Sequence, residues 1–425
     1  MTDDTQAVAQ KARPDLPNAA EVVGRGHRAA ARADELVWVG SHGLAARDVR
    51  SGAEAAVAAI ARALDEERSG VEDLVRVGVY YDQVLDDTEV RHAIREALPD
   101  SARPVVNLLP VREPALPGAA LVVDATAASG PRTTIGDADF PRAVRVGERI
   151  WIGGTRGAGA GILAQTGDVI ARLGSTAAEA GAALDDCVKM NIAYVGEGTE
   201  DDWEPTARLR GAAFKEPAAA ATGIPYPRLA GGALTQFEML SVAGSTGTRR
   251  HGWPTGHWDW PIHLPWKHAC RAGDLVTVGG QVSLRGRGEV VAPGDLGRQT
   301  ATALRNIERA LATVEARMSD VTQVTAFFEG SSIDLETILA RTRTAFGERP
   351  PPIVPVPLPY LAYREMVVEI RGHRPGPKRC RRAREGTDRE GSERQLAAHP
   401  ESWSRGVEPT LGFEPRTCCL RTRWA

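Results

Sequence analysis

The sequence predicts an α+β protein in which three similar modules follow one another along a single chain. Three observations lead to this prediction. A strand pattern that ends in glycine occurs three times, an amphipathic helix follows each strand, and the same order of further elements then repeats. Equivalent glycines lie about 113 to 126 residues apart. A repeat of this length is a whole domain and not the short unit of a solenoid.

Each module is expected to open with a charged turn, a buried strand and a glycine. The three segments are DELVWVGSHG (34–43), ERIWIGGTRG (148–157) and DLVTVGGQVS (274–283). Apolar residues spaced by three and four then indicate a helix, because this spacing places them on one helical face. These stripes are Val57, Ile60 and Leu64; Ile170, Leu173, Ala177, Ala180 and Leu184; and Leu304, Ile307, Leu311 and Val314.

A second strand, a second helix and a last strand complete each module. The second strands are VEDLVRVGVYY (71–81), LDDCVKMNIAY (184–194) and MSDVTQVTAFF (318–328). The second helices lie near 88–98, 203–214 and 334–346, and the proline-punctuated segments with the last strands lie at 106–127, 223–243 and 354–372.

The expected domain organisation follows from these elements. It consists of a disordered N-terminus (1–20), modules at 21–128, 138–245 and 256–373, and a disordered basic tail (374–425). The segments 128–139 and 244–265 are expected to be joins between modules, the first of them rich in turn residues.

Charge and cysteine content argue against several functions. Residues 374–425 hold 12 Lys and Arg against 7 Asp and Glu, so the rest of the chain carries a net charge of −8, which disfavours nucleic-acid binding by the folded part. No run of 18 apolar residues and no secretory signal is present, so we expect a cytoplasmic protein with no membrane partner. Cys187 and Cys270 have no metal-type spacing and suggest neither a metal site nor a disulfide.

An ordered set of motifs resembles the RidA/YjgF family of reactive-intermediate deaminases. The third module matches best, through KHACRAGDLVTVGGQVSL (267–284), RQTATALRNIERAL (298–311) and VVEI (367–370). The second module matches at FPRAVRVGERIWIGG (140–154) and LDDCVK (184–189). The first module is the most diverged, and the resemblance extends over about residues 25–373.

The resemblance implies a fold, an assembly and a chemistry. Family members have a small mixed sheet backed by two helices, similar to the chorismate-mutase-like fold, and assemble as homotrimers with clefts between subunits. Three modules in one chain therefore imply an intramolecular pseudo-trimer. The family's deaminases hydrolyse imines and enamines such as 2-aminoacrylate without a cofactor. An arginine holds the substrate carboxylate, and a glutamate helps to orient the attacking water.

Site residues follow from the positions that match the family pattern. The two catalytic candidates are Glu369, which would orient the water, and Arg103, which would anchor the substrate. Further candidates for contacts with the substrate are the aromatic residues Trp266 and Phe140, the strand-end glycines Gly153, Gly154, Gly279 and Gly280, and Gln281. The corresponding positions of the glutamate in modules two and one hold Gln236 and Val122.

The arginine position departs from the family pattern. Ile353, Ala221 and Val106 stand where active deaminases have arginine, and Arg103 lies three residues before Val106. The chain is therefore either a hydrolase with a substitute anchor or a non-catalytic homologue that binds small molecules. The site candidates also have structural explanations: Glu369 would be an exposed strand residue, Trp266 a packing residue, and the glycines would serve tight turns.

The segment 251–270 has an unusual composition, with four of the nine histidines and four of the nine tryptophans. It is expected either to form an aromatic wall over a cleft, suited to an aromatic or heterocyclic ligand, or to pack as a linker against the seam between modules. Its histidine spacing does not match a helical or finger-type metal site.

Overall fold

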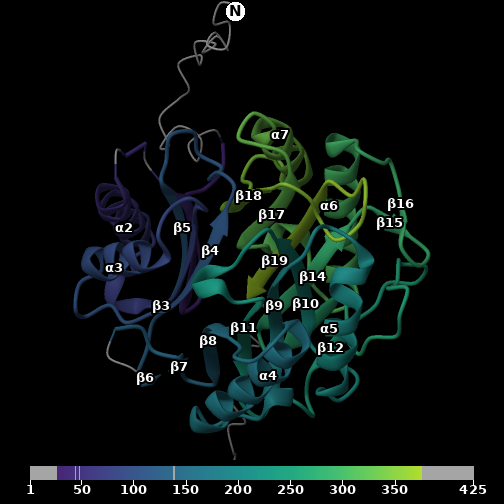
Figure 1. The fold of residues 1–425 in the computed structure, drawn as a ribbon, viewed down its shortest axis with the longest axis horizontal. Helices are drawn as coiled ribbons and strands as arrows, with labels where there is room; N and C mark the ends of the chain where they lie inside the picture. Colours follow the sequence, from purple (N-terminus) through teal and green to yellow (C-terminus); the bar gives the residue numbers. More distant parts are fainter. Residues whose placement is uncertain (1–25, 44, 47, 137–138, 376–425) are drawn as a thin grey trace, which may run out of the picture. The chain divides into compact units, whose positions relative to one another are not determined.

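The computed structural model describes residues 26–43, 45–46, 48–136 and 139–375, which form three mixed sheets, each backed by two helices (Figure 1). The α+β class is therefore confirmed. The two segments expected to be disordered, 1–20 and 374–425, lie outside the described residues except for the last two residues of β19. Among the described residues, no helix has the length and apolarity needed to cross a membrane.

The first sheet has the strand order β1-β2-β5-β3-β4. Its strands are β1 (Ala30–Ala33), β2 (Leu36–His42), β3 (Leu74–Asp82), β4 (Val105–Val111) and β5 (Leu121–Ala128), and its helices are α2 (Val49–Glu66) and α3 (Asp87–Ala97).

The second sheet has the order β10-β9-β11-β8-β7-β6. Its strands are β6 (Arg132–Ile135), β7 (Ala143–Val146), β8 (Arg149–Arg156), β9 (Cys187–Val195), β10 (Ala220–Tyr226) and β11 (Thr235–Val242), with helices α4 (Ile162–Glu179) and α5 (Glu200–Ala212).

The third sheet has the order β12-β13-β14-β19-β17-β18. Its strands are β12 (Arg250–Gly252), β13 (Ala269–Ala272), β14 (Leu275–Val282), β17 (Gln323–Glu329), β18 (Ile353–Leu358) and β19 (Val368–Pro375), with helices α6 (Leu296–Ala312) and α7 (Leu335–Phe346). The short strands β15 (Leu284–Arg285) and β16 (Glu289–Val290) form a separate hairpin.

The order of elements expected from the sequence is found in all three sheets. The predicted stripes supply part of each buried helix face, but Leu184 lies in the 3₁₀ turn before β9, and Ala180 and Val314 follow the ends of α4 and α6. The acidic residue before each second strand has a local role. Asp73, Asp186 and Asp320 each accept a hydrogen bond from the backbone N–H three residues earlier, which closes a short 3₁₀ turn. This turn directs the chain into the buried strand that follows.

The two joins contain strands, which the sequence analysis did not anticipate. β6 lies within 128–139 and pairs with β7, and β12 lies within 244–265 and pairs with β13. Both strands add to the edge of a sheet, where unpaired backbone groups offer hydrogen-bond partners to a neighbouring segment.

The register of the sheets shows which residues occupy equivalent places. In each module, the residue at a fixed distance after the turn aspartate lies on the second strand and has a partner on the neighbouring parallel strand. These partners are Val106 on β4, Ala221 on β10 and Ile353 on β18. A second equivalent place pairs with Val122, Gln236 and Glu369 on β5, β11 and β19. The positions aligned from the sequence alone are therefore equivalent in the fold.

The three sheets meet at three places, which we call the β2–β18, β4–β8 and β10–β14 seams. Gly40 of β2 lies against Ile353, Gly153 of β8 lies against Val105, and Gly279 of β14 lies against Ala221. A Cβ added to Gly279 would come within 2.8 Å of the Ala221 carbonyl oxygen. Glycine therefore allows two backbones to approach closely at this seam.

Candidate functional site

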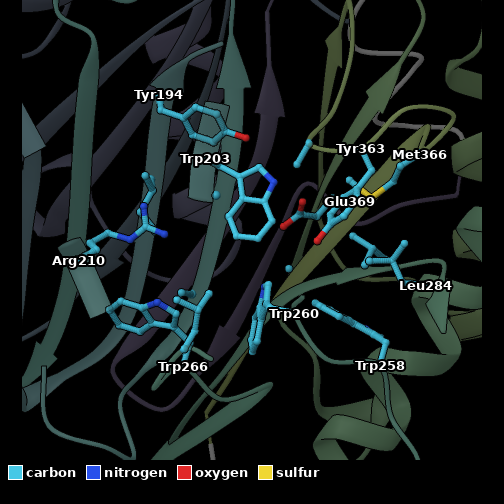
Figure 2. A pocket seen from close by; sticks show the side chains of 17 residues that line it. Tyr194, Trp203, Arg210, Trp258, Trp260, Trp266, Leu284, Tyr363, Met366 and Glu369 are labelled. Carbon is cyan, nitrogen blue, oxygen red and sulfur yellow. The ribbon is translucent and has the colours of Figure 1, made fainter. Parts of the chain in front are cut away.

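The β10–β14 seam contains a cavity of about 70 Å³, room for several water molecules or a small ligand. Its walls come from β9, β10 and α5 of the second sheet and from β14 and β19 of the third. The segment 258–266, between β12 and β13 of the third sheet, also lines the cavity, as do Leu284 of β15 and the segment 362–366 before β19. Figure 2 shows Arg210 and Glu369 pointing into this cavity from opposite sides, with the tryptophan rings between and below them.

Glu369, on β19, places a buried carboxyl group in the cavity. Its residue is 7% exposed, and its side chain lies over Gly280 on β14, where an added Cβ would fall 1.6 Å from Oε1. β14 is irregular here, since its register with β19 shifts between Val278 and Gln281. Burial raises the pKa of Glu369 to about 8, against the opposing effects of Lys189 and Arg371. The carboxyl group is therefore mainly protonated at neutral pH.

Arg210, on α5, places a buried guanidinium in the same cavity. The residue is 6% exposed, and burial lowers its pKa to about 10. Its closest described partners are aromatic, with ring centroids of Phe237 and Trp266 at 5.7 and 5.9 Å, and its Nε has no hydrogen-bond partner. Among the described residues it forms no ion pair. A buried cation in this state favours an anionic ligand.

Aromatic side chains form most of the remaining wall. The rings of Trp258 and Trp260 lie edge to face at 5.2 Å, and Trp203 lies 6.0 Å from Tyr363. Several hydrogen-bond donors in this wall are buried without a partner. They are the indole nitrogens of Trp203, Trp258 and Trp266 and the hydroxyl groups of Tyr194 and Tyr363. The cavity is thus apolar in its surfaces and rich in donors for the oxygens of a ligand.

A histidine and glutamine network holds the aromatic segment in place. The side-chain oxygen of Gln281 lies 2.8 Å from His257 Nε2, and His268 Nε2 lies 3.1 Å from the Trp258 carbonyl oxygen. The His268 ring also stacks on Trp260 at 5.2 Å. Burial, aided by His257, lowers the pKa of His268 to about 3, so its ring is neutral. Gln281 therefore ties this wall to the end of β14.

The structure brings together three of the candidates expected from the sequence. Glu369, Trp266 and Gly280 all line the cavity, whereas Gly279 lies behind it on the seam and Gln281 acts through the histidines.

The other candidates lie away from this cavity. Gly153 and Gly154 belong to the β4–β8 seam. Phe140 is a core residue beneath the Arg91 guanidinium, 4.7 Å from it. Arg103 precedes β4 in the first sheet and does not line a cavity built by the second and third sheets. The two catalytic candidates, Arg103 and Glu369, therefore do not line the same cavity.

Arg210 is the main site residue that the sequence analysis missed. Arg210 lies as far from its helix N-cap Thr199 as Ala97 lies from Asp86 and Ala345 from Asp334. The repeat therefore does not predict a cation at this position. One signal was available. Arg210 follows Trp203 and Ala207 at the spacing that places it on the buried face of α5.

The other two seams lack an acid at the equivalent place. At the β4–β8 seam, Gln236 Nε2 donates to the Leu108 carbonyl oxygen at 3.3 Å, beside a cavity of about 30 Å³. At the β2–β18 seam the place is taken by the buried Val122. Of the three equivalent places, one therefore holds a carboxyl group.

No group of three or more His, Cys, Asp or Glu side chains that could hold a metal ion occurs within the described ranges.

Comparison with known proteins agrees with the third sheet as the best-matching part. Residues 261–373 match the family model of endoribonuclease L-PSP. No curated protein matches the chain.

Among solved structures, a chorismatase shares the fold over 71% of this chain and 93% of its own, at 16% identity and a TM-score of 0.51. Shorter structures also match. A member of the YjgF/YER057c/UK114 family from Mycobacterium tuberculosis is 24% identical, covering 30% of this chain and 99% of its own with a TM-score of 0.26. RidA from the Antarctic bacterium Psychrobacter sp. is 22% identical, covering 26% and 93% with a TM-score of 0.24. The chain is thus similar to the endoribonuclease L-PSP, or RidA-like, family over its module at residues 261–373.

Proposed function

We propose that the chain is a RidA-like hydrolase that deaminates reactive imine or enamine intermediates of the 2-aminoacrylate type in the cavity of the β10–β14 seam. The supporting observation is that one cavity holds both the unpaired guanidinium of Arg210 and the protonated carboxyl group of Glu369. Ala221, at the family's arginine position, lines the same cavity. Arg210 thus supplies from α5 the positive charge that β10 lacks.

The chemistry assigns a role to each group. Arg210 binds the substrate carboxylate through charge-assisted hydrogen bonds. Glu369 donates its proton to the methylene carbon of the enamine, which converts the enamine to an iminium ion, and water then adds to the carbon of the C=N bond. The resulting carbinolamine releases nitrogen as ammonium and leaves a 2-oxo acid. Because ammonium departs with an additional proton, each turnover consumes one proton from the site.

We also propose that modules 21–128, 138–245 and 256–373 act as the three subunits of an intramolecular pseudo-trimer, with a single working cleft. This proposal is supported by the three glycine-lined seams and by the equivalent register of Val122, Gln236 and Glu369.

The direct test is ammonia release from freshly generated 2-aminoacrylate or 2-iminopropanoate, measured against the spontaneous rate in buffer. We expect the wild-type chain to accelerate release and Glu369→Gln to abolish most of the acceleration. A non-catalytic binding protein is the alternative. It would show a raised melting temperature with small 2-oxo acids but no acceleration, and this result would overturn the hydrolase proposal.

A second candidate is hydrolysis of an enol ether that bears a carboxylate, such as chorismate. The tryptophan-lined cavity with its unpaired donors also suits a ring-bearing, oxygen-rich ligand. A chorismatase shares the fold at 16% identity, and chorismate is therefore a reasonable substrate to test. The two candidates use the same first step, protonation of a methylene carbon by Glu369. Pyruvate release from chorismate, without ammonia release from imines, would favour the second.

A further inference from the structure

Lys189 is the basic residue of the LDDCVK motif, and the proposed chemistry gives it no role. It lies on β9, is 1% exposed, and extends its ammonium group to the seam. Nζ donates to Thr222 Oγ1 at 2.6 Å and to the Val278 carbonyl oxygen at 3.0 Å. Lys189 therefore joins the second sheet to β14 directly behind the cavity.

Lys189 and Glu369 reach the same irregular turn of β14 from different strands. Val278, the acceptor for Lys189, directly precedes the pair Gly279 and Gly280, and the carboxyl group of Glu369 lies on Gly280. The two side chains also interact electrostatically. The amine and the acid of the cavity therefore meet at the same turn of β14.

A polar cavity lies on the other side of Lys189. Ala221 and Gly223 face the 70 Å³ cavity, whereas Thr222, between them on β10, lines a cavity of about 30 Å³ to which all three sheets contribute. That smaller cavity is lined by polar atoms without a partner, namely both side-chain polar atoms of Asn107, the amide oxygens of Asn191 and Gln236, and Arg371 Nε. The cavity is large enough for a water molecule, and these unpaired polar atoms would be its hydrogen-bond partners.

The charges around Lys189 allow it to change its protonation. Burial and then Arg371 lower the pKa of Lys189 well below its usual value, while Glu369 raises it. An ionised Glu369 therefore favours the ammonium form, and a protonated Glu369 favours the neutral amine. Further titratable and charged groups face the pair of Lys189 and Glu369. They are Arg371 and His373 from β19, Glu238 from β11, Cys187 and Tyr194 from β9, and Tyr363.

We propose that Lys189 is a positioning residue that acts through Glu369 by returning a proton to its carboxylate between turnovers. After Glu369 gives its proton to the substrate, the Lys189 amine takes a proton from hydrated protons in the polar cavity and becomes an ammonium ion. The ammonium ion then transfers that proton to the Glu369 carboxylate, and both groups return to their starting state. This inference rests on the proposed hydrolase function, which consumes one proton per turnover.

The test compares the first turnover with later ones in rapid-quench experiments. In Lys189→Met, Glu369 is protonated at the start, so the first turnover should keep its rate while later turnovers slow by about tenfold. KM should change little. Thr222→Val, which removes the hydroxyl group facing the polar cavity, should slow later turnovers in the same way. Lys215→Met, at an exposed lysine, is the matched control and should behave as wild type.

The outcomes separate this inference from the function on which it rests. Equal slowing of first and later turnovers would indicate a structural role and overturn the inference, as would unchanged later turnovers in both variants. If the wild-type chain hydrolyses nothing, the re-protonation of Glu369 after a pH jump remains measurable by infrared spectroscopy, with Glu369→Gln identifying the band. Slower re-protonation in Lys189→Met would support the relay, and equal rates would overturn it.

Discussion

Arg210 is a buried guanidinium whose described neighbours are aromatic rings instead of carboxylates. In water-excluded surroundings, its hydrogen bonds to an anionic ligand are of the charge-assisted kind. Each such bond contributes about 1.5–3 kcal/mol. The position therefore decides whether the cavity selects carboxylates.

We expect Arg210→Met to lower kcat/KM for a carboxylate substrate by about 10- to 150-fold, the range that corresponds to one lost charge-assisted bond. Steady-state kinetics with the substrate and with its neutral amide would check this, because the amide should lose little. Arg208→Met on the exposed side of α5 serves as control. An equal loss for both substrates would argue against a carboxylate contact.

Glu369 makes the reaction and the stability of the fold depend on pH in the same direction. With a pKa of about 8, raised by burial, the acid is available below pH 8, and kcat/KM should fall as pH rises above it. The folded pKa exceeds the unfolded value, so the folded state is relatively stabilised at low pH and loses stability as pH rises from about 4.5 to 8.

Glu369→Gln should remove both dependences. The glutamine cannot ionise, so the variant should be more stable than wild type at pH 7, by about 3 kcal/mol as an upper figure. Denaturant unfolding of both proteins at pH 5 and 7 would measure this. A wild-type stability that does not fall over this interval would show that the carboxyl group ionises normally.

At the level of single residues, the sequence pointed to cavity-lining residues only at positions where this chain keeps the family pattern. Glu369, Trp266 and Gly280 were expected and lie in one cavity. Arg210 was not expected, because it lies on a helix, where neither the repeat nor the family pattern marks the position. Only the packing of α5 against the seam reveals that this helix face is also a cavity wall.

Among the elements, the irregular turn of β14 positions the acid. Since a Cβ at Gly280 would overlap Glu369 Oε1, Gly280→Ala should displace the carboxyl group and reduce kcat by at least about tenfold. Gly174→Ala is the control, because a Cβ there meets nothing within 4 Å and lies on α4. This control should instead stabilise the fold by about 0.5–1 kcal/mol. Activity and melting temperature together check both expectations.

The elements themselves were predictable from periodicity, whereas their pairing at the edges was not. Amphipathic stripes fix the helices, and the acidic turns fix the starts of the second strands. β6 and β12 carry no comparable pattern. They are strands because an open edge of β7 or β13 lies beside them, and that edge exists only once the sheet has formed.

Across the whole described chain, a buried ion cluster links the first and second sheets. Arg76 of β3 pairs with Asp124 of its own sheet and with Glu238 of the second sheet, to which Asn191 also donates at 3.2 Å. Burial raises the pKa of Asp124. Burial also acts to raise the pKa of Glu238, but the Arg76 guanidinium acts in the other direction, and overall the pKa of Glu238 is lowered. The arginine is therefore needed to keep two buried carboxylates compatible with folding.

Arg76→Met should destabilise the protein by about 3–5 kcal/mol at pH 7, since both carboxylates lose their counter-charge. The deficit should shrink as pH falls towards 5, because without Arg76 both acids become protonated more readily. Denaturant unfolding at the two pH values checks the prediction, with the exposed Arg172→Met as a control that changes little. A deficit independent of pH would indicate lost packing alone.

The three equivalent places occupied by Val122, Gln236 and Glu369 have a consequence for how this protein can vary. In an assembly of identical subunits, one codon change alters every cleft at once, so an acid needed anywhere must be kept everywhere. Here each place is encoded separately. Val122 and Gln236 fill two of these places and Glu369 the third, so a change at the acid need not weaken the packing at the other two seams.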